Sequence, residues 1–310
     1  MGDTLDLERA LVIGVASSAL FDLSESDAVF RQQGEERYRE YQREHLDDVL
    51  EPGVAFPFIR RLLDLNDLSD RERLAEVVIL SRNDPETGMR VMRSVQHHGL
   101  DITRAIFMQG RAPYRFMEPL RMSLFLSANE ADVREAISLG FAAGHVVGRA
   151  VPDDGDADLR IAFDFDGVLA DDSAERVYQS EGLDGYQESE SALAEVPLSR
   201  GPMADFLEKI NRIQRIEESK SADDPSGYRR RVHVAVVTAR SAPAHERAIN
   251  SIRGWGLRVN DAFFLGGIDK GPILEVLQPH IFFDDQRRNV DGAARSTPSV
   301  HIPFGELNGA

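Results

Sequence analysis

The chain has 310 residues, of which 42% are hydrophobic and 29% charged, a composition typical of a globular protein with two ordinary domains or one large one. Its 36 basic and 53 acidic side chains give a net charge of −17, which disfavours binding to nucleic-acid polymers or anionic membranes because the field of the protein repels both. There is no cysteine, so disulfides, iron–sulfur clusters, cysteine zinc sites and thiol nucleophiles are excluded.

The first apolar run, Ala10–Leu20, could be mistaken for the core of an export signal. The residues before it include Asp3, Asp6 and Glu8 against a single Arg9, whereas an export signal carries positive charge there. No segment approaches the ~18 uninterrupted apolar residues that a membrane span requires. We therefore expect a cytoplasmic protein without membrane association.

Short β-branched and aliphatic runs alternate with helical patterns along the chain. The predicted strands are Ala10–Val15, Val77–Leu80, Ala105–Met108, Leu124–Leu126, Leu159–Phe163, Val232–Val237, Ala262–Leu265 and Ile281–Phe283. Several are uniformly apolar, as expected for parallel strands covered on both faces. Helices are predicted between them, for example over Ala131–Leu139, Pro202–Ile216 and Pro243–Trp255. This alternation predicts an α/β fold with doubly wound parallel sheets.

The chain also contains an internal repeat. A shift of 157 residues aligns Ser81–Val133 with Thr238–Val290 without a gap and with nine identities. Strand, helix and Gly-Leu turn fall in register in the two segments, which indicates two copies of one α/β unit. The acidic stretch Asp153–Asp158 is predicted to link the two domains, residues 1–152 and 159–310.

Two acids follow the strand Leu159–Phe163 directly. They are Asp164 and Asp166, and Gly167 after them lets the chain turn sharply. Ligands of open α/β sheets bind at the carboxyl ends of the strands. Carboxylates at this spacing can present one oxygen to a metal and another to a reacting phosphorus. A strand closed by an Asp-Gly turn would explain one of the two acids but not both.

Polar side chains stand at the ends of three later segments as well. They are Thr238-Ala239-Arg240 after a strand, Lys270 at a predicted helix start, and Asp284-Asp285 after the last predicted strand. Each has a structural explanation when taken alone, such as helix capping by Thr238 or a solvated Lys270. Because these residues occur in this order near the ends of successive strands, we predict that they form a single site.

The order Asp-x-Asp-Gly, strand-Thr, Lys, strand-Asp-Asp resembles the haloacid dehalogenase-like phosphatase superfamily. In more detail the chain resembles the cytosolic 5′-nucleotidase I family over roughly Leu11–Gly305. The matching segments are Ser17–Phe21, Ala55–Phe58, Leu126–Asn129, Ile161–Asp166, Val237–Ser241, Ser251–Leu257, Lys270–Pro272 and Pro279–Gln286. The resemblance implies two Rossmann-like, haloacid dehalogenase-like units with parallel sheets, the second carrying a cap insertion.

The resemblance also implies roles for these polar residues. Asp164 would be the nucleophile, forming an aspartyl-phosphate, and Asp166 the general acid and base. Thr238 and Lys270, with the Ala239-Arg240 loop, would bind and neutralise the phosphoryl oxygens.

A magnesium ion is part of the same expectation. Asp164, the backbone carbonyl of Asp166, and Asp284 with Asp285 would surround Mg²⁺, which prefers hard oxygen ligands. Without a cation these carboxylates would repel one another and an anionic substrate.

Residues 1–152 are predicted to be a degenerate, non-catalytic half. At the offset of 157 the residues opposite Lys270, Asp284 and Asp285 are Pro113, Ser127 and Ala128. The first strand ends in Ala16-Ser17-Ser18 where the two catalytic acids would stand, and only Ser81, opposite Thr238, keeps a hydroxyl. This half is expected to support the fold, to dimerise, or to line the pocket.

The segment of residues 171–228 is predicted to be the cap insert, because it is too long for a simple connection. The arginines Arg229–Arg231 after it are either an anion site or, more simply, part of a solvated loop. Base recognition is left open, since the aromatic residues Phe56, Phe58, Tyr114 and Tyr186 fit a core equally well.

The expected function is Mg²⁺-dependent hydrolysis of nucleoside 5′-monophosphates, with AMP the favoured small-molecule substrate. The alternatives are a phosphatase for another small phosphoester and a nucleotide-binding regulatory protein. The resemblance further implies a homo-oligomer and a nucleotide effector such as ADP.

Overall fold

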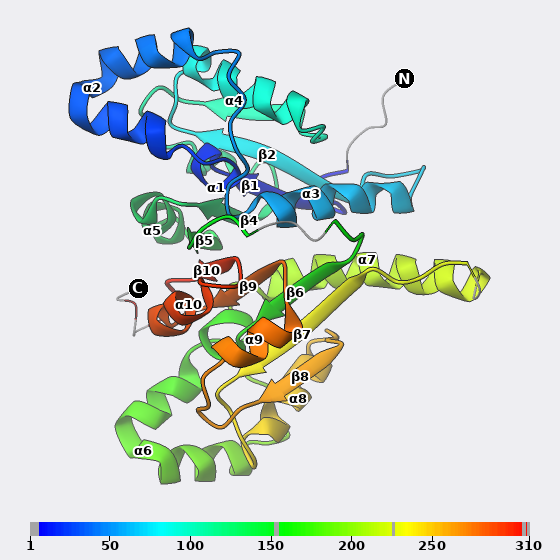
Figure 1. Cartoon of the computed structure of the whole chain (residues 1–310). Coiled ribbons are helices and arrows are strands. Elements are labelled where there is room, and N and C mark those ends of the chain that lie inside the picture. Colours follow the sequence, from blue (N-terminus) through cyan, green and yellow to red (C-terminus); the bar gives the residue numbers. More distant parts are fainter. Residues whose placement is uncertain (1–5, 152–154, 225–226, 306–307, 309–310) are drawn as a thin grey trace. The chain divides into compact units, whose positions relative to one another are not determined.

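Each half of the chain is built on a parallel sheet of buried aliphatic strands (Figure 1). The structure is a computed structural model that describes residues 6–151, 155–224, 227–305 and 308. The chain divides into two compact units, residues 1–153 and 154–310. The predicted linker at 153–158 falls partly on residues 152–154, which lie outside the described residues.

The first unit has the strand order β3-β2-β1-β4-β5, with every neighbouring pair parallel. Its elements are β1 (Leu11–Val15), α1 (Ser17–Leu20), α2 (Ser24–Glu44), α3 (Phe56–Asp64), η1 (Leu65–Leu68), β2 (Ala75–Ser81), α4 (Pro85–His97), β3 (Arg104–Phe107), η2 (Tyr114–Phe116), β4 (Met122–Ser127), α5 (Glu130–Ser138) and β5 (Ala143–Val147).

The second unit has the order β10-β9-β6-β7-β8, again with every neighbouring pair parallel. Its elements are β6 (Leu159–Phe163), the turn η3 (Phe165–Leu169), α6 (Ser173–Ala192), α7 (Ala204–Asp223), β7 (Val232–Thr238), α8 (His245–Gly254), β8 (Asp261–Phe264), α9 (Gly271–Leu277), β9 (Ile281–Asp284), α10 (Arg287–Ala293) and β10 (Ser299–His301).

The predicted α/β fold and all eight predicted strands are confirmed, with strand ends that differ by no more than two residues. The strands β5 and β10 are missing from the prediction. β5 includes a glycine and a histidine and is only partly buried, and β10 has three residues, so neither produces a periodic apolar pattern. Among the described residues, no helix has the length and hydrophobicity needed to cross a membrane.

The internal repeat recurs in the elements themselves. Read from its outer β3 or β8 edge, each sheet has the same order, because β3, β2, β1, β4 and β5 correspond to β8, β7, β6, β9 and β10. β2 and β3 recur 157 residues later as β7 and β8. Upstream of β2 the offset is 148, as β1 and β6 show, because the segment with α7 is longer than the segment with α3. The repeat therefore extends beyond the stretch aligned from the sequence.

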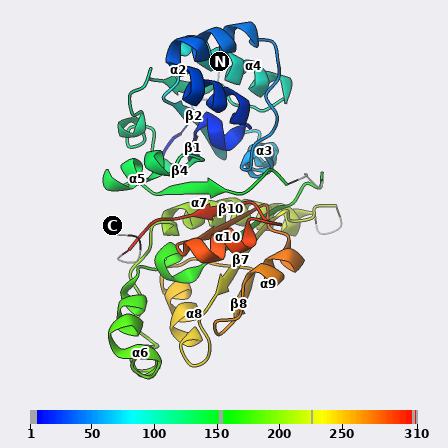
Figure 2. The ribbon, with the colours of Figure 1, turned by 60° about the vertical axis from the view of Figure 1, so that its left-hand side comes forward.

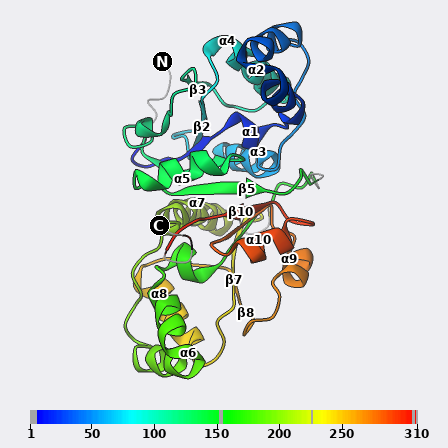
Figure 3. The ribbon, with the colours of Figure 1, turned by 90° about the vertical axis from the view of Figure 1, so that its left-hand side faces the viewer.

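Each unit also has a long helix interrupted by a glycine. The interruption is at Gly34 in α2 (φ 83°) and, 148 residues later, at Gly182 in α6 (φ 72°). Positive φ is easily adopted only by glycine, so both helices bend at a fixed point. Figures 2 and 3 show α2 beside α4 in the first unit and α6 beside α8 in the second.

Helix α7 packs on the sheet of the second unit. The ring of Phe206 is fully buried, with its centroid 6.0 Å from that of Phe163 on β6 and 5.9 Å from that of Phe283 on β9. α7 is therefore the crossover helix between β6 and β7, and of the two helices in residues 171–228 it covers the sheet.

We predict that Phe206→Ala lowers the free energy of unfolding by about 3–5 kcal/mol, because it leaves a cavity between helix and sheet. Urea denaturation followed by circular dichroism measures this change. The control is Val276→Ala, at a side chain that is 86% exposed, which should change stability by less than about 0.5 kcal/mol. Similar losses in the two variants would contradict the proposed packing role.

Candidate active site

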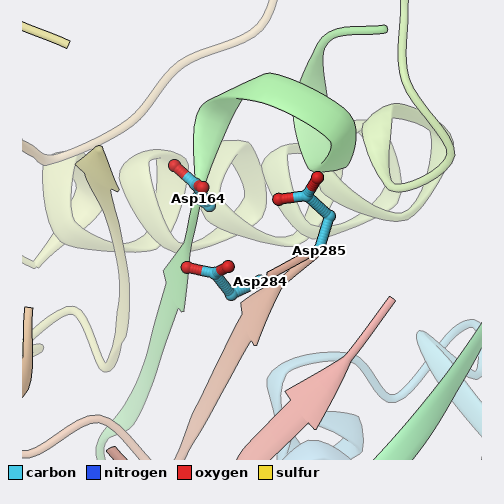
Figure 4. A group of neighbouring side chains, drawn as sticks. All are labelled: Asp164, Asp284 and Asp285. Carbon is cyan, nitrogen blue, oxygen red and sulfur yellow. The ribbon is translucent and has the colours of Figure 1, made fainter. Parts of the chain in front are cut away.

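Three buried acids meet at the carboxyl edge of the second sheet. Asp164 follows β6, Asp284 ends β9, and Asp285 follows it, so two adjacent parallel strands deliver all three. One carboxylate oxygen from each lies within 4.8 Å of the others. Figure 4 shows the three side chains converging in front of the two strand ends. The structure thus brings three of the four predicted acids to one place.

Lys270 supplies the positive charge at this cluster. It stands just before α9, and its Nζ lies 2.8 Å from Asp164 Oδ2 and 2.7 Å from Asp284 Oδ2. Burial alone would lower the pKa of this ammonium group, but the two carboxylates outweigh burial and raise it. Lys270 is therefore charged and holds the two acids together.

The third acid, Asp285, forms no ion pair with the part of the chain that the structure describes, although the charge of Lys270 partly offsets its high pKa. Burial, and then the charges of Asp164 and Asp284, raise the pKa of Asp285 to about 9. The same kinds of cause raise the pKa of Asp164 to about 7, against the lowering effect of Lys270. Asp285 Oδ1 is buried and accepts no hydrogen bond. A hard divalent cation fits this set of carboxylate oxygens and would satisfy the unused one.

Asp166 is not one of the three clustered acids. Its carboxylate forms a two-pronged pair with Arg240, with Nε 2.8 Å from Oδ2 and Nη2 2.6 Å from Oδ1. The chain turns at Gly167, directly after Asp166, where φ is +72°. A Cβ atom there would lie 2.5 Å from the Asp285 carboxylate, so the glycine is required by space as well as by conformation.

Arg240 belongs to a buried ion network that the sequence did not predict. Its Nη1 contacts the carboxylate of Glu190 on α6, which also accepts from Arg247 on α8 at 2.6 Å. Only 2% of Glu190 is exposed. The network joins the candidate acid/base Asp166 to α6 and α8. Glu190 lies 50 residues from Arg240, and no local pattern marks it.

The remaining predicted site residues lie at the end of β7. Thr238 is buried, and its Oγ1 accepts the backbone N–H of Arg240 at 3.2 Å. Ala239 between them is exposed. This turn orients the Thr238 hydroxyl and the Arg240 guanidinium at the same sheet edge as the acids.

The aromatic residues left open by the sequence fall into two groups. Phe56, Phe58 and Tyr114 are buried in the core of the first unit. The ring of Tyr186 instead lies 5.9 Å from the Arg240 guanidinium and packs edge-on against Tyr178, at 6.0 Å and 89°. The aromatic pair Tyr178–Tyr186 on α6 is thus near the site. Only Tyr186 of this pair was identified from the sequence.

The arginines Arg229 and Arg230 are used within the chain. Arg229 pairs with Asp158 at 2.7 Å, and Arg230 lies 3.8 Å from Glu218. The two arginines themselves are exposed, which fits the simpler interpretation of this segment as part of a solvated loop.

Comparison with known proteins places these features in a family. A family model described as 5′-nucleotidase matches residues 3–309. The chain is also 34% identical over 301 residues to a human protein, cytosolic 5′-nucleotidase 1B. That match covers 93% of this chain and 48% of the human protein, so the chain spans about half of the relative's length. No solved structure gives a significant match.

We predict that the metal-free protein loses stability as pH rises from about 4 to about 9. Asp164 and Asp285 have pKa values of about 7 and about 9 in the folded state, so the folded protein retains protons that the unfolded chain releases near pH 4. Because the folded state binds more protons, its free energy of unfolding falls across this window. Thermal melts at stepped pH in EDTA measure the slope.

Asp285→Asn should make this slope shallower, and Mg²⁺ should do so in the unmodified protein because it stabilises the ionised acids. The matched control is Asp261→Asn at an exposed acid, which should leave the slope unchanged. A slope that is the same in Asp285→Asn would contradict this assignment.

Glu190→Gln should lower the free energy of unfolding by about 3–5 kcal/mol, because it leaves two buried arginines without their shared charge. Chemical denaturation measures this loss. Glu188→Gln, at an exposed position of the same helix, should cost less than about 0.5 kcal/mol. A loss below about 1 kcal/mol in Glu190→Gln would show that the network contributes little.

Proposed function

The chain belongs to the 5′-nucleotidase family, a family of phosphoric monoester hydrolases, and on this premise we propose that it hydrolyses nucleoside 5′-monophosphates, with AMP favoured. The observation that carries the proposal is the cluster of Asp164, Asp284 and Asp285 with Lys270 at one sheet edge. The relative's printed name supports a cytosolic location for this chain too.

Asp164 is proposed as the nucleophile. Its carboxylate attacks the phosphorus in line, the bond to the nucleoside O5′ breaks, and an aspartyl-phosphate forms that water then hydrolyses. The contact of Lys270 with Asp164 Oδ2 supports this role, because it favours the ionised carboxylate and leaves a cation where phosphoryl oxygens must sit.

Mg²⁺ is the proposed metal, held by Asp164, Asp284 and Asp285, with the backbone carbonyl of Asp166. A bound Mg²⁺ would neutralise the acids and polarise the phosphoryl group. The unused Asp285 Oδ1 supports this assignment.

Thr238 would donate its hydroxyl to a phosphoryl oxygen.

Asp166 is proposed as the general acid and base, first protonating the leaving O5′ and then accepting a proton from the attacking water. Arg240 holds its carboxylate in a fixed position in the structure. Arg240 is therefore a positioning residue for the base step. For Asp166 to carry a proton, at least one of its two hydrogen bonds from Arg240 must break.

We propose a haloacid dehalogenase-like arrangement in which α6 is the cap. The cap is proposed to be the part of residues 171–228 that precedes α7, a division supported by the packing of α7 on the sheet. Glu190 and the aromatic pair Tyr178–Tyr186 then belong to the cap, over the carboxyl edge of the sheet. The first unit is proposed to be non-catalytic, since Ala16, Ser127 and Ala128 stand at the positions of acids.

We predict that Asp164→Asn abolishes Mg²⁺-dependent phosphate release from AMP, because an amide cannot form the phosphoenzyme, while the circular dichroism spectrum stays unchanged. A phosphate-release assay measures turnover, and its substrates should include IMP, pyrimidine monophosphates and a sugar phosphate, with and without ADP. The control is Asp205→Asn, at an exposed acid on α7, which should retain turnover. Residual Asp164→Asn activity near that of the unmodified protein would refute the mechanism. Faster release from the sugar phosphate than from every nucleotide would refute the substrate class.

A further inference from the structure

The first unit contains a cavity of about 1550 Å³ at the carboxyl edge of its sheet. The lining includes Ala16 after β1, Ser81 at the end of β2 and Ala128 after β4. These three strands correspond to β6, β7 and β9, whose ends carry the acids and Thr238 in the second unit. The cavity therefore occupies the place that the candidate active site occupies in the other copy.

The aromatic pair of the second unit has a counterpart on this cavity. Phe30 and Tyr38 on α2 pack edge-on at 5.6 Å and 84°, and both line the cavity. They stand 148 residues before Tyr178 and Tyr186, on either side of the glycine that bends each helix. Phe30 is 50% exposed, although it is a large apolar side chain. An exposed aromatic side chain beside a cavity can stack against the flat ring of a ligand.

Two serines with buried side chains line the same cavity. Ser81 Oγ accepts the backbone N–H of Asn83 at 3.1 Å, as Thr238 Oγ1 does for Arg240. Ser17 also lines the cavity, and only 3% of it is exposed. Its Oγ is buried and has no hydrogen-bond partner. A buried hydroxyl without a partner destabilises the protein, and a polar ligand would satisfy it.

The charges of the cavity differ from those of the active site. The acids at the sheet edge are replaced, and Pro113 stands opposite Lys270. The described lining has six acidic side chains and three arginines, and the two buried arginines of this unit, Arg61 and Arg90, are not part of it. A phosphate group would meet a net negative surface without a buried cation, whereas an uncharged ligand would not incur that cost.

We propose that this cavity is a second, non-catalytic site that binds a nucleoside without a phosphate group and without a metal. The base packs against the Phe30–Tyr38 pair, and the sugar hydroxyls bond to Ser17 and Ser81. The ligand class rests on the proposed function, because the corresponding aromatic pair of the second unit lies near the proposed nucleotide site. The site would take the organic product of that reaction.

The test is calorimetric titration of the metal-free protein in EDTA with the four common ribonucleosides, AMP, and inorganic phosphate. At least one nucleoside should bind, more tightly than AMP, and phosphate alone should not bind. Phe30→Ala should weaken nucleoside binding by about fivefold or more, as expected for a lost stacking contact. The control is Leu139→Ala, at an exposed apolar side chain of the first unit that does not line the cavity, and it should leave this affinity unchanged.

Ser17→Ala gives a second readout that a structural role would not produce. It removes an unsatisfied buried hydroxyl, so the ligand-free protein should melt at the same or a higher temperature, while nucleoside affinity falls roughly threefold to tenfold. Equal affinities in the unmodified protein, Phe30→Ala and Ser17→Ala would overturn the proposal, as would the absence of nucleoside binding or tighter binding of AMP. Phosphate release by the unmodified protein is assayed separately, so hydrolysis without nucleoside binding refutes only this inference, and binding without hydrolysis refutes only the proposed function.

Discussion

The bridge that Lys270 makes between Asp164 and Asp284 is the interaction on which the second unit depends. Burying three carboxylates beside one another is unfavourable, and one ammonium group at 2.8 and 2.7 Å offsets part of that cost. It ties the end of β6 and the end of β9 to the residue that precedes α9. Because one lysine cannot neutralise three acids, the fold leaves a deficit of positive charge that suits a divalent cation.

The reliable part of the sequence prediction concerned strands and the residues directly after them. A buried parallel strand is a continuous apolar run, and its carboxyl end is where ligand groups collect, so Asp164, Thr238 and Asp284 could be placed at one edge. Glu190 and Tyr178 could not be found this way. They lie on a polar helix whose position is set by contacts about 50 residues apart in the chain, and the bend at Gly182 interrupts its periodicity.

The two units show which parts of a site change independently. Elements that shape the site recur in both, including the bent helix, the aromatic pair and the hydroxyl at the end of β2 or β7. Even the buried arginine on the following helix is kept, since Arg90 and Arg247 both reach toward residues after the bent helix. Charged groups that would act on a phosphoryl group do not recur. The shape of the site has therefore been preserved, whereas these charged residues have not.

The close approach of Gly167 to Asp285 has a historical consequence. In the first unit the corresponding residues are Ala19 and Ala128, so both positions differ together. An alanine introduced at Gly167 while the acid remained would place its Cβ 2.5 Å from a carboxylate oxygen. With the acid gone, that space opens, and Ala19 sits within the short helix α1. If the two units diverged from a common active ancestor, the acid was lost before the glycine, and the unit stopped binding metal before its backbone turn relaxed.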